Sequence, residues 1–175
     1  MEIRRAVKAD IDCIEKIYER IHDNEEKGLT TIGWIRGVYP TKKTAEDALN
    51  REDLFVMAED GQILASAVIN QIQVEEYKDA AWKHNGNDNE VMVLHCLVVD
   101  PLINGKGCGR AFVDFYESYA KEQGYPYLRM DTNVINKRAR ELYSLLGYDE
   151  IGVVSCVFNG IPGVRLVCLE KYLGN

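Results

Sequence analysis

The 175-residue sequence lacks the features that mark several large classes of protein. No apolar stretch reaches the length of a membrane span, and residues 1–16 lack the apolar core of a secretion signal. A run of basic residues is also missing, and the net charge of -7 argues against a nucleic-acid-binding surface. These absences predict a cytoplasmic protein whose partners are neither membranes nor nucleic acids.

Cysteine pairs at metal-binding or redox spacing are absent as well. The sequence has five cysteines, and no two of them form a C-x-x-C pattern. Five thiols cannot all be paired, so we expect neither a disulfide framework nor a zinc or other metal site. Free thiols are typical of a reducing compartment, which agrees with the cytoplasm.

Nothing in the sequence divides the chain into parts. We find no internal repeat and no linker, and 46% hydrophobic with 28% charged residues is ordinary for a globular protein. The chain is long enough to bury one full core. We therefore predict a single domain over residues 1–175.

The most informative stretch is 91–112, which predicts a strand, a loop and a helix. The apolar run Val91–Val99 is too short to span a membrane and is rich in β-branched residues, as expected of a strand buried on both faces. Pro101 cannot continue a strand ladder. The strand should therefore end before it, and an amphipathic helix follows the loop.

Three glycines in the loop, Gly105, Gly107 and Gly109, alternate with other residues. Without Cβ atoms at these positions, a ligand can approach successive backbone N–H groups where the helix begins, and the helix dipole adds positive potential. Lys106 and Arg110 add positive side chains, so the loop is a candidate pyrophosphate site. From the glycines alone, the alternative is a turn that only reverses the chain.

Two familiar phosphate-binding motifs are excluded. A P-loop requires Ser or Thr directly after Gly-Lys, but Gly107 follows Lys106. The dinucleotide motif requires a small residue at the place where Phe112 stands.

Residues 104–109 instead resemble the acyl-CoA loop of the GCN5-related N-acetyltransferases, the GNAT superfamily. They fit the family pattern of Arg or Gln, two residues, Gly, one residue, and Gly or Ala, except that Asn104 is shorter than Arg or Gln. Residues 136–148 resemble a second family segment, Asn-x-x-Ala-x-x-x-Tyr-x-x-x-Gly-Phe, with Tyr148 in place of Phe. The two matches in this order are far more specific than either alone. Basic residues gather near them in an otherwise acidic chain: Lys106, Arg110, Lys137, Arg138 and Arg140.

The resemblance implies an α/β GNAT fold, with a mixed central sheet of about seven strands and flanking helices in the order β-α-α-β-β-β-α-β-α-β-β. Hydrophobic spacing and turn signals give the same order. The expected strands are 2–7, 54–59, 63–73, 91–99, 127–132, 149–158 and 164–171, and the expected helices are 10–22, 41–51, 137–146 and one that leads from the glycine loop to a stop at Gly124.

The resemblance also implies a function, the transfer of an acetyl group from acetyl-CoA to a primary amine by direct attack in a ternary complex. The acceptor can be a small molecule or a peptide, and because dimers are common in the family, a homodimer is a further implied partner. The alternatives are a module that binds or senses acyl-CoA without catalysis, and a transferase that uses another acyl-CoA donor. The implied cofactor-binding residues are Leu97, Val98, Val99, Asn104, Gly105, Lys106, Gly107, Cys108, Gly109, Arg110 and Asn136.

Two residues are candidates for the chemistry. Tyr143 falls on the family's tyrosine, which commonly stands near the thioester sulfur as general acid, although a tyrosine between leucines is also typical of a core. His95 lies in the apolar strand, where strict alternation would put its side chain on one face with Leu97, and Cys96 on the other. Burial would keep His95 neutral and able to accept a proton; the alternative is a core histidine with a hydrogen-bond partner.

The remaining site residues are predicted from location. Glu90, at the start of the central strand, is the second candidate base. Trp34 and Tyr39, in the segment 23–40, are candidate acceptor-binding residues expected to be exposed, unless this segment is a surface connection with its aromatics packed beneath it. Asn136 either holds the cofactor or caps the following helix.

Overall fold

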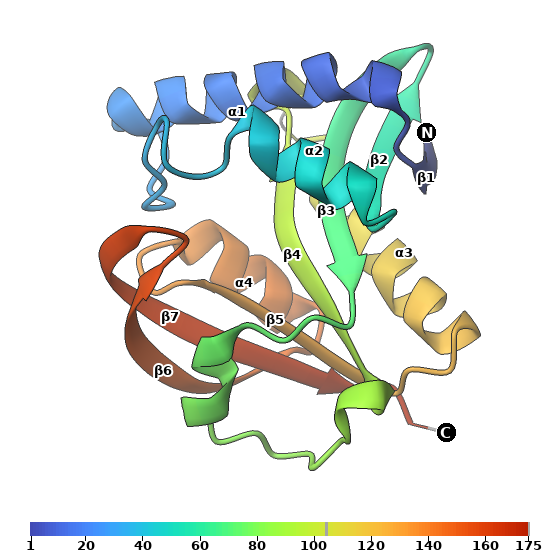
Figure 1. Ribbon diagram of the computed structural model, residues 1–175, viewed down its shortest axis with the longest axis vertical. Coiled ribbons are helices and arrows are strands. Elements are labelled where there is room, and N and C mark those ends of the chain that lie inside the picture. The colour runs from blue at the N-terminus through green and yellow to red at the C-terminus, as the bar shows by residue number, and fades with distance from the viewer. Residues whose placement is uncertain (104, 175) are drawn as a thin grey trace.

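The computed structural model of the chain describes residues 1–103 and 105–174, in which seven strands form one sheet (Figure 1). The strands lie in the order β1-β2-β3-β4-β5-β7-β6, and all neighbours are antiparallel except β4 and β5, which are parallel. The strands are β1 (Glu2–Arg5), β2 (Leu54–Glu59), β3 (Gln62–Asn70), β4 (Val91–Val99), β5 (Tyr127–Asn133), β6 (Asp149–Phe158) and β7 (Ile161–Tyr172). The α-helices are α1 (Ile11–Glu26), α2 (Lys42–Asn50), α3 (Cys108–Glu122) and α4 (Lys137–Leu145). The predicted mixed sheet and element order are confirmed.

One face of the sheet is covered by α1 and α2 (Figure 1). The apolar positions of α1 recur every three or four residues, so Ile14, Ile17 and Ile21 lie on one side of the helix and are buried. They pack against Val56 of β2 and Val68 of β3. Each fully buried side chain of this size contributes about 1.5–3 kcal/mol.

The opposite face is covered by α3 and α4. Phe112, Val113 and Tyr116 of α3 are fully buried and pack against Met92 and Leu94 of β4. The Tyr116 hydroxyl donates a hydrogen bond of 2.6 Å to the Met92 carbonyl oxygen. This contact fixes α3 across the middle of the sheet.

The segment between β3 and β4 packs on the same face as α1 and α2, farther along the sheet. It contains the 3₁₀ turns η2 (Glu75–Asp79) and η3 (Asp88–Glu90). Tyr77 and Trp82 meet edge to face with ring centroids 5.0 Å apart, and the Arg129 guanidinium lies 4.1 Å from the Trp82 ring centre. These contacts hold the segment against β5.

Several element ends differ from the prediction. Helix α1 extends past the predicted end at residue 22 to Glu26. Its last turn is polar and carries no hydrophobic spacing, so the sequence pattern did not reveal it. Strand β3 ends at Asn70, before the predicted end of its apolar run. Strand β7 begins at Ile161, which pairs with Phe158 across a two-residue turn.

Strand β4 contains a bulge at Cys96 that the sequence pattern did not reveal. Cys96 has a φ of 49°, and the pairing with β3 shifts by one residue beyond His95. An extra residue reverses the alternation of faces. Leu97 therefore packs with the core under α3, whereas Cys96 packs with residues under α1. The prediction that His95 and Leu97 share a face opposite Cys96 is wrong.

Strands β4 and β5 are paired over only part of their length. The parallel ladder joins Val91–Leu94 to Tyr127–Met130. Beyond it β4 stays paired with β3, and β5 stays paired with β7, so the two strands part (Figure 1). This parting opens the centre of the sheet next to the bulge.

Within residues 1–103 and 105–174, no helix has the length and apolar character that crossing a membrane requires. All five cysteines are free.

Candidate active site

The described residues form a crevice of about 1140 Å³ where β4 and β5 part. Cys96–Val99 of β4 and Asp131–Asn133 of β5 line it. Its lining also includes the glycine loop, the first turn of α4, part of the segment between α1 and α2, and the β6–β7 hairpin. The predicted cofactor and acceptor segments therefore meet in one cavity.

The glycine loop presents open backbone to this crevice. Gly105 and Gly107 have φ values of 86° and 74°, and a Cβ added at either would meet no atom within 4 Å. Helix α3 begins at Cys108, within the glycine loop, and the Ala111 N–H donates to the Gly107 carbonyl oxygen at 3.0 Å. The N–H groups before it have no intrahelical partner and attract an anion. Asn104 lies outside the described residues.

Basic side chains surround this open backbone. Lys106 of the loop, Arg110 in the first turn of α3, and Lys137 and Arg138 of α4 line the crevice. Arg140 does not join them, because its guanidinium pairs with Glu150 of β6 at 2.6 Å. Arg140 therefore anchors α4 to the sheet.

Helix α4 brings Asn136 and Tyr143 to the crevice. The Asn136 side chain accepts the Ala139 N–H at 3.2 Å, so Asn136 is the N-cap of α4, and it also lines the crevice. Tyr143 is 7% exposed. Burial raises the pKa of Tyr143 well above its usual value, and the nearby Asp131 and Cys96 add smaller contributions in the same direction. Its hydroxyl is therefore protonated at neutral pH and can donate a hydrogen bond.

His95 and Glu90 are not among the described residues that line the crevice. His95 Nε2 lies 3.0 Å from Asn70 Oδ1, and the Asn70 amide donates to Asp53 at 2.8 Å. Burial lowers the pKa of His95 to about 4, so the ring is neutral. Glu90 accepts the Asn87 N–H at 2.9 Å and caps η3. The contacts of His95 favour the alternative of a core histidine with a partner.

Asp131 is a crevice residue that the sequence analysis missed. It lies on β5 just past the ladder with β4 and accepts a hydrogen bond of 2.8 Å from the Tyr77 hydroxyl. Burial raises the pKa of Asp131 to about 7, although the Tyr77 hydrogen bond opposes this rise and Glu76 adds to it. A carboxyl group that titrates near neutral pH inside a cleft is a candidate acid or base. An acidic residue at the carboxyl end of a predicted parallel strand was the available signal.

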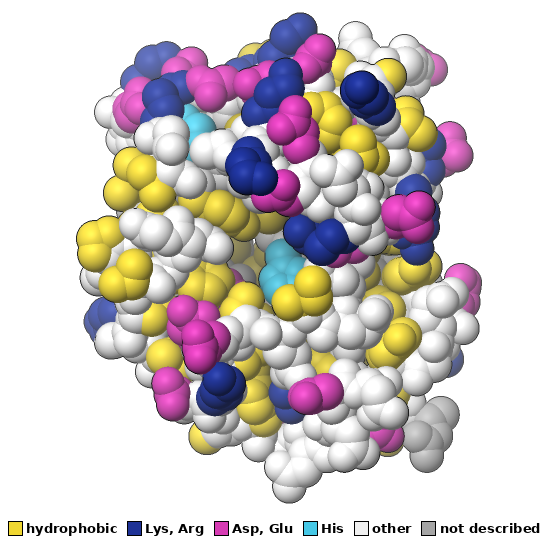
Figure 2. Space-filling view, in the orientation of Figure 1, with side chains coloured by type: hydrophobic (Ala, Val, Ile, Leu, Met, Phe, Trp, Pro, Cys, Tyr) yellow, Lys and Arg dark blue, Asp and Glu magenta, His cyan; other side chains and the backbone are white. Residues whose placement is uncertain are grey.

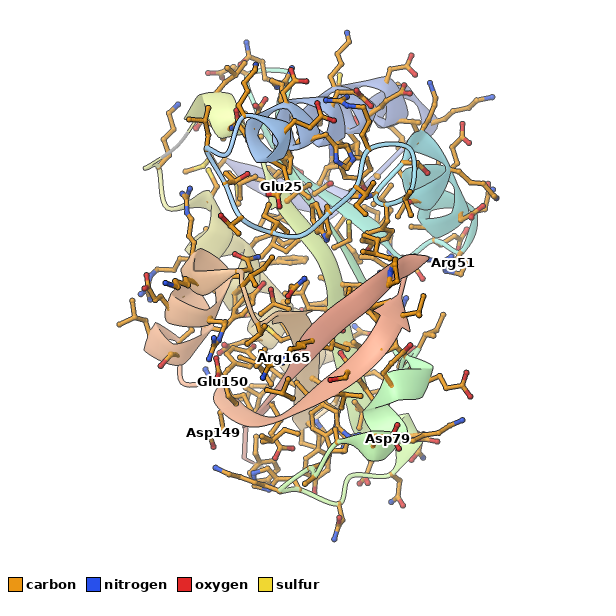
Figure 3. The ribbon with its side chains drawn as sticks, turned by 90° about the vertical axis from the view of Figure 1, so that its left-hand side faces the viewer. Glu25, Arg51, Asp79, Asp149, Glu150 and Arg165 are labelled. Atoms are coloured by element: carbon orange, nitrogen blue, oxygen red, sulfur yellow. The ribbon has the colours of Figure 1, made fainter. Side chains whose placement is uncertain are left out.

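Trp34 and Tyr39 also line the crevice, but they are half-buried rather than exposed. Their rings meet edge to face with centroids 5.8 Å apart and pack against the β6–β7 hairpin. The segment that carries them is held to α1 by Glu25, whose carboxylate accepts the N–H groups of Ile32 at 2.8 Å and Gly33 at 2.7 Å. Figure 3 shows Glu25 beside this segment, above the hairpin. The segment is therefore a fixed wall of the crevice.

Comparison with known proteins identifies relatives of the chain. The profile of the acetyltransferase (GNAT) family matches residues 15–148. An uncharacterised N-acetyltransferase of Methanocaldococcus jannaschii is 37% identical over 76 residues, which cover 43% of this chain and 34% of that protein. The match thus spans about a third of that relative's length.

Solved structures share the fold. An acetyltransferase of the GNAT family from Streptococcus agalactiae matches with a TM-score of 0.81 and 23% identity, over 99% of this chain and 96% of that one. A proposed acetyltransferase of Salmonella typhimurium, solved with its cofactor acetyl-CoA, matches with a TM-score of 0.69 and 18% identity, over 99% and 94% of the two chains.

The part of the chain that matches the family includes β4, β5, the glycine loop and α4 as far as Tyr148. These are the elements that build most of the crevice. The resemblance found in the sequence is confirmed, and the chain belongs to the GNAT family of acetyltransferases.

Proposed function

We propose that the chain is an N-acetyltransferase that moves an acetyl group from acetyl-CoA to a primary amine by direct attack. One observation carries the proposal: Asp131, with a pKa of about 7, and the protonated Tyr143 line the same crevice as the open start of α3. A base, a hydrogen-bond donor and an anion site are the parts that this reaction requires. Family membership supports the same activity.

The residues of the crevice fit acetyl-CoA. Main-chain N–H groups of residues 105–110, with Lys106 and Arg110, would hold the pyrophosphate. Cys108 can contribute only its main chain, because its side chain is buried in the core. The edge of β4 at Leu97–Val99 faces the parted region and can pair with the amides of the pantetheine arm as an added strand.

The chain's residues then have separate tasks in the transfer. Acetyl-CoA supplies the acetyl group as a thioester. The amine reacts in its neutral form after it has released its ammonium proton to water, and the Asp131 carboxylate accepts the second proton, which the nitrogen loses as the N–C bond forms. The Tyr143 hydroxyl donates a hydrogen bond to the sulfur, which keeps the electron pair of the broken C–S bond and takes its proton from water. Asp131 later releases its proton to water, which balances the reaction.

A covalent enzyme intermediate through Cys96 is disfavoured. Burial raises the pKa of the Cys96 thiol to about 11, so the thiolate that would act as nucleophile is scarce at neutral pH. Direct attack by the amine remains the supported route.

Replacing Tyr143 with Phe should lower turnover at least about tenfold, because the sulfur loses its hydrogen-bond donor during C–S cleavage. Cofactor affinity should change by less than a few fold, as measured by calorimetry with CoA. Tyr148→Phe is the matched control: its buried ring lies 6.1 Å from that of Tyr143 and is not part of the described lining. Equal turnover in the two variants would remove Tyr143 from the chemistry.

The His95→Ala variant should retain the acidic limb of the pH–rate profile at the same midpoint, because His95 lies outside the described lining and its ring is neutral above about pH 4. Steady-state rates of the variant and the parent protein between pH 5 and 9 would check this. Loss of the limb would make His95 the base in place of Asp131.

Calorimetry with CoA and assays of CoA release across a panel of amines test the proposed function. We expect binding, and turnover with at least one amine. Binding without turnover on any acceptor would favour the non-catalytic module. A preference for a larger acyl-CoA would identify a different donor.

A further inference from the structure

We propose that the acceptor is an apolar primary monoamine, a single amino group on a chain that ends in an aromatic or branched aliphatic group. This inference rests on the proposed function, because it assigns an acceptor to the same crevice. It follows from how charge and apolar surface are divided along the described lining.

The charged side chains of the lining are separated by sign. Asp131 is the only acidic residue among the lining residues that the structure describes. Glu76 influences Asp131 from η2 but is not part of this lining. The basic residues of the lining belong to the glycine loop, α3 and α4: Lys106, Arg110, Lys137 and Arg138. An acceptor beside Asp131 therefore meets one negative group, which suits one amino group.

Apolar side chains make up most of the hairpin side of the crevice, with Asn159 at its turn. Ile161, Val164 and Leu166 line it and are 7%, 6% and 1% exposed. Phe158, at the end of β6, and Trp34 add aromatic rings to the same cluster. Burying a phenyl-sized group against such a surface increases affinity on the order of 10- to 100-fold. The substituent of the amine should therefore be apolar.

The route toward this wall is apolar too. A Cβ added at Gly160, in the hairpin turn, would lie 3.3 Å from Val38 Cγ1, so the turn touches the segment between α1 and α2. Val38 is 43% exposed and its neighbour Ile35 is 46% exposed. Figure 2 shows hydrophobic side chains gathered on its left side, where Figure 1 places this segment and the hairpin turn. Arg36 of the same segment is paired with carboxylates of α1, with Glu26 at 2.8 Å and Asp23 at 2.6 Å, so its charge is already matched.

Other amines fit this division of charge less well. A polyamine brings a second ammonium group that has no second carboxylate in the described lining. A free amino acid brings a carboxylate next to Asp131, while the cations of the lining lie where the pyrophosphate is expected. Each of these amines adds a charge for which the described lining offers no counter-charge beside Asp131.

Two matched pairs of amines test the inference with the whole protein and acetyl-CoA. Phenethylamine and phenylalanine differ by one carboxylate, and pentylamine and cadaverine differ by a terminal amino group. We expect kcat/KM to be at least about 100-fold higher for phenethylamine than for phenylalanine, and at least about tenfold higher for pentylamine than for cadaverine. A peptide with an N-terminal alanine and the polyamine spermidine complete the panel.

The outcomes separate the two proposals. Higher kcat/KM with cadaverine, spermidine or the peptide would overturn the apolar monoamine and leave the N-acetyltransferase standing. CoA binding without turnover of any amine would overturn the proposed function, and the acceptor with it.

A variant localises the effect to the hairpin wall. Phe158→Ala should raise KM for phenethylamine about tenfold and leave KM for acetyl-CoA unchanged, because only acceptor contacts are lost. Val157→Ala, at an adjacent position of β6 that is 63% exposed, is the control and should match the parent protein. Trp34→Leu repeats the test at a second aromatic residue of the same cluster in case Phe158→Ala fails to fold. Unchanged KM for phenethylamine in a folded Phe158→Ala or Trp34→Leu protein would overturn the assignment.

Discussion

An Asp131→Asn variant is expected to lose at least about 100-fold in kcat/KM for the amine while its affinity for CoA changes little. A positioned general base typically contributes 100-fold or more, and asparagine cannot accept a proton. The asparagine oxygen can still accept the Tyr77 hydrogen bond, which is 2.8 Å in the parent protein. The loss therefore reports the missing base rather than a lost contact.

The dependence of kcat/KM on pH provides a second test of Asp131 as the base. The active form of Asp131 is the carboxylate, and its pKa is about 7. For the parent protein, kcat/KM should thus fall as pH drops below about 7, and this limb should be absent from the variant. The titratable groups that interact with Asp131 include Glu76 and Tyr77 of η2, Tyr39, Cys96 of β4, Tyr143 of α4, Cys156 of β6 and Cys168 of β7.

Stability measurements show whether the variant is folded. The pKa of Asp131 rises from 3.8 to about 7 on folding, so the native state binds the extra proton and loses stability as pH rises between these values. The asparagine of the variant carries no charge to bury. The variant should therefore be more stable than the parent at pH 8, by up to about 4 kcal/mol, and the difference should vanish near pH 4.

The exposed Asp79→Asn change in η2 is the matched control and should alter neither rate nor stability (Figure 3). Full activity in a folded Asp131→Asn protein would refute the base assignment.

The second large effect is expected at the glycine loop. Gly107→Leu should weaken CoA binding roughly 10- to 100-fold, because the new side chain fills the space in front of the α3 N–H groups and blocks charge-assisted hydrogen bonds. Calorimetry with CoA measures the change directly. Turnover at saturating acetyl-CoA should fall much less than affinity.

Gly124→Leu is a close control for backbone strain. Gly124 follows α3, has a φ of 81°, and like Gly107 has no atom within 4 Å of an added Cβ. Both substitutions place a side chain in the left-handed region, at about 1–2 kcal/mol each. Both proteins should lose similar thermal stability, and only Gly107→Leu should lose CoA affinity. Equal CoA affinity in both variants would show that the loop does not bind the cofactor.

Local patterns in the sequence were sufficient for the fold. Helix α3 and strand β4 are each defined by spacing within one short stretch, and the glycine loop and Tyr143 lie in contiguous motifs. These features depend on residues that are neighbours in sequence, so periodicity and turn chemistry predict them. The element order followed for the same reason.

The features missed by the sequence analysis depend on contacts between distant segments. Asp131 becomes a crevice residue because β4 and β5 part, and that parting is a property of two strands together. Because of the bulge at Cys96, Leu97 lies on the opposite face of the sheet from the one that strict alternation predicts. Arg140 was expected near the cofactor, but Glu150 binds it from β6.

The short parallel ladder between β4 and β5 has a mechanical consequence. Four residues on each strand carry the main-chain hydrogen bonding across the middle of the sheet, from Val91–Leu94 to Tyr127–Met130. A pantetheine arm paired along β4 would stiffen the region where β4 and β5 are not paired with each other. Binding of acetyl-CoA would then itself make the sheet more rigid, so the protein would be most rigid when the acetyl donor is in place.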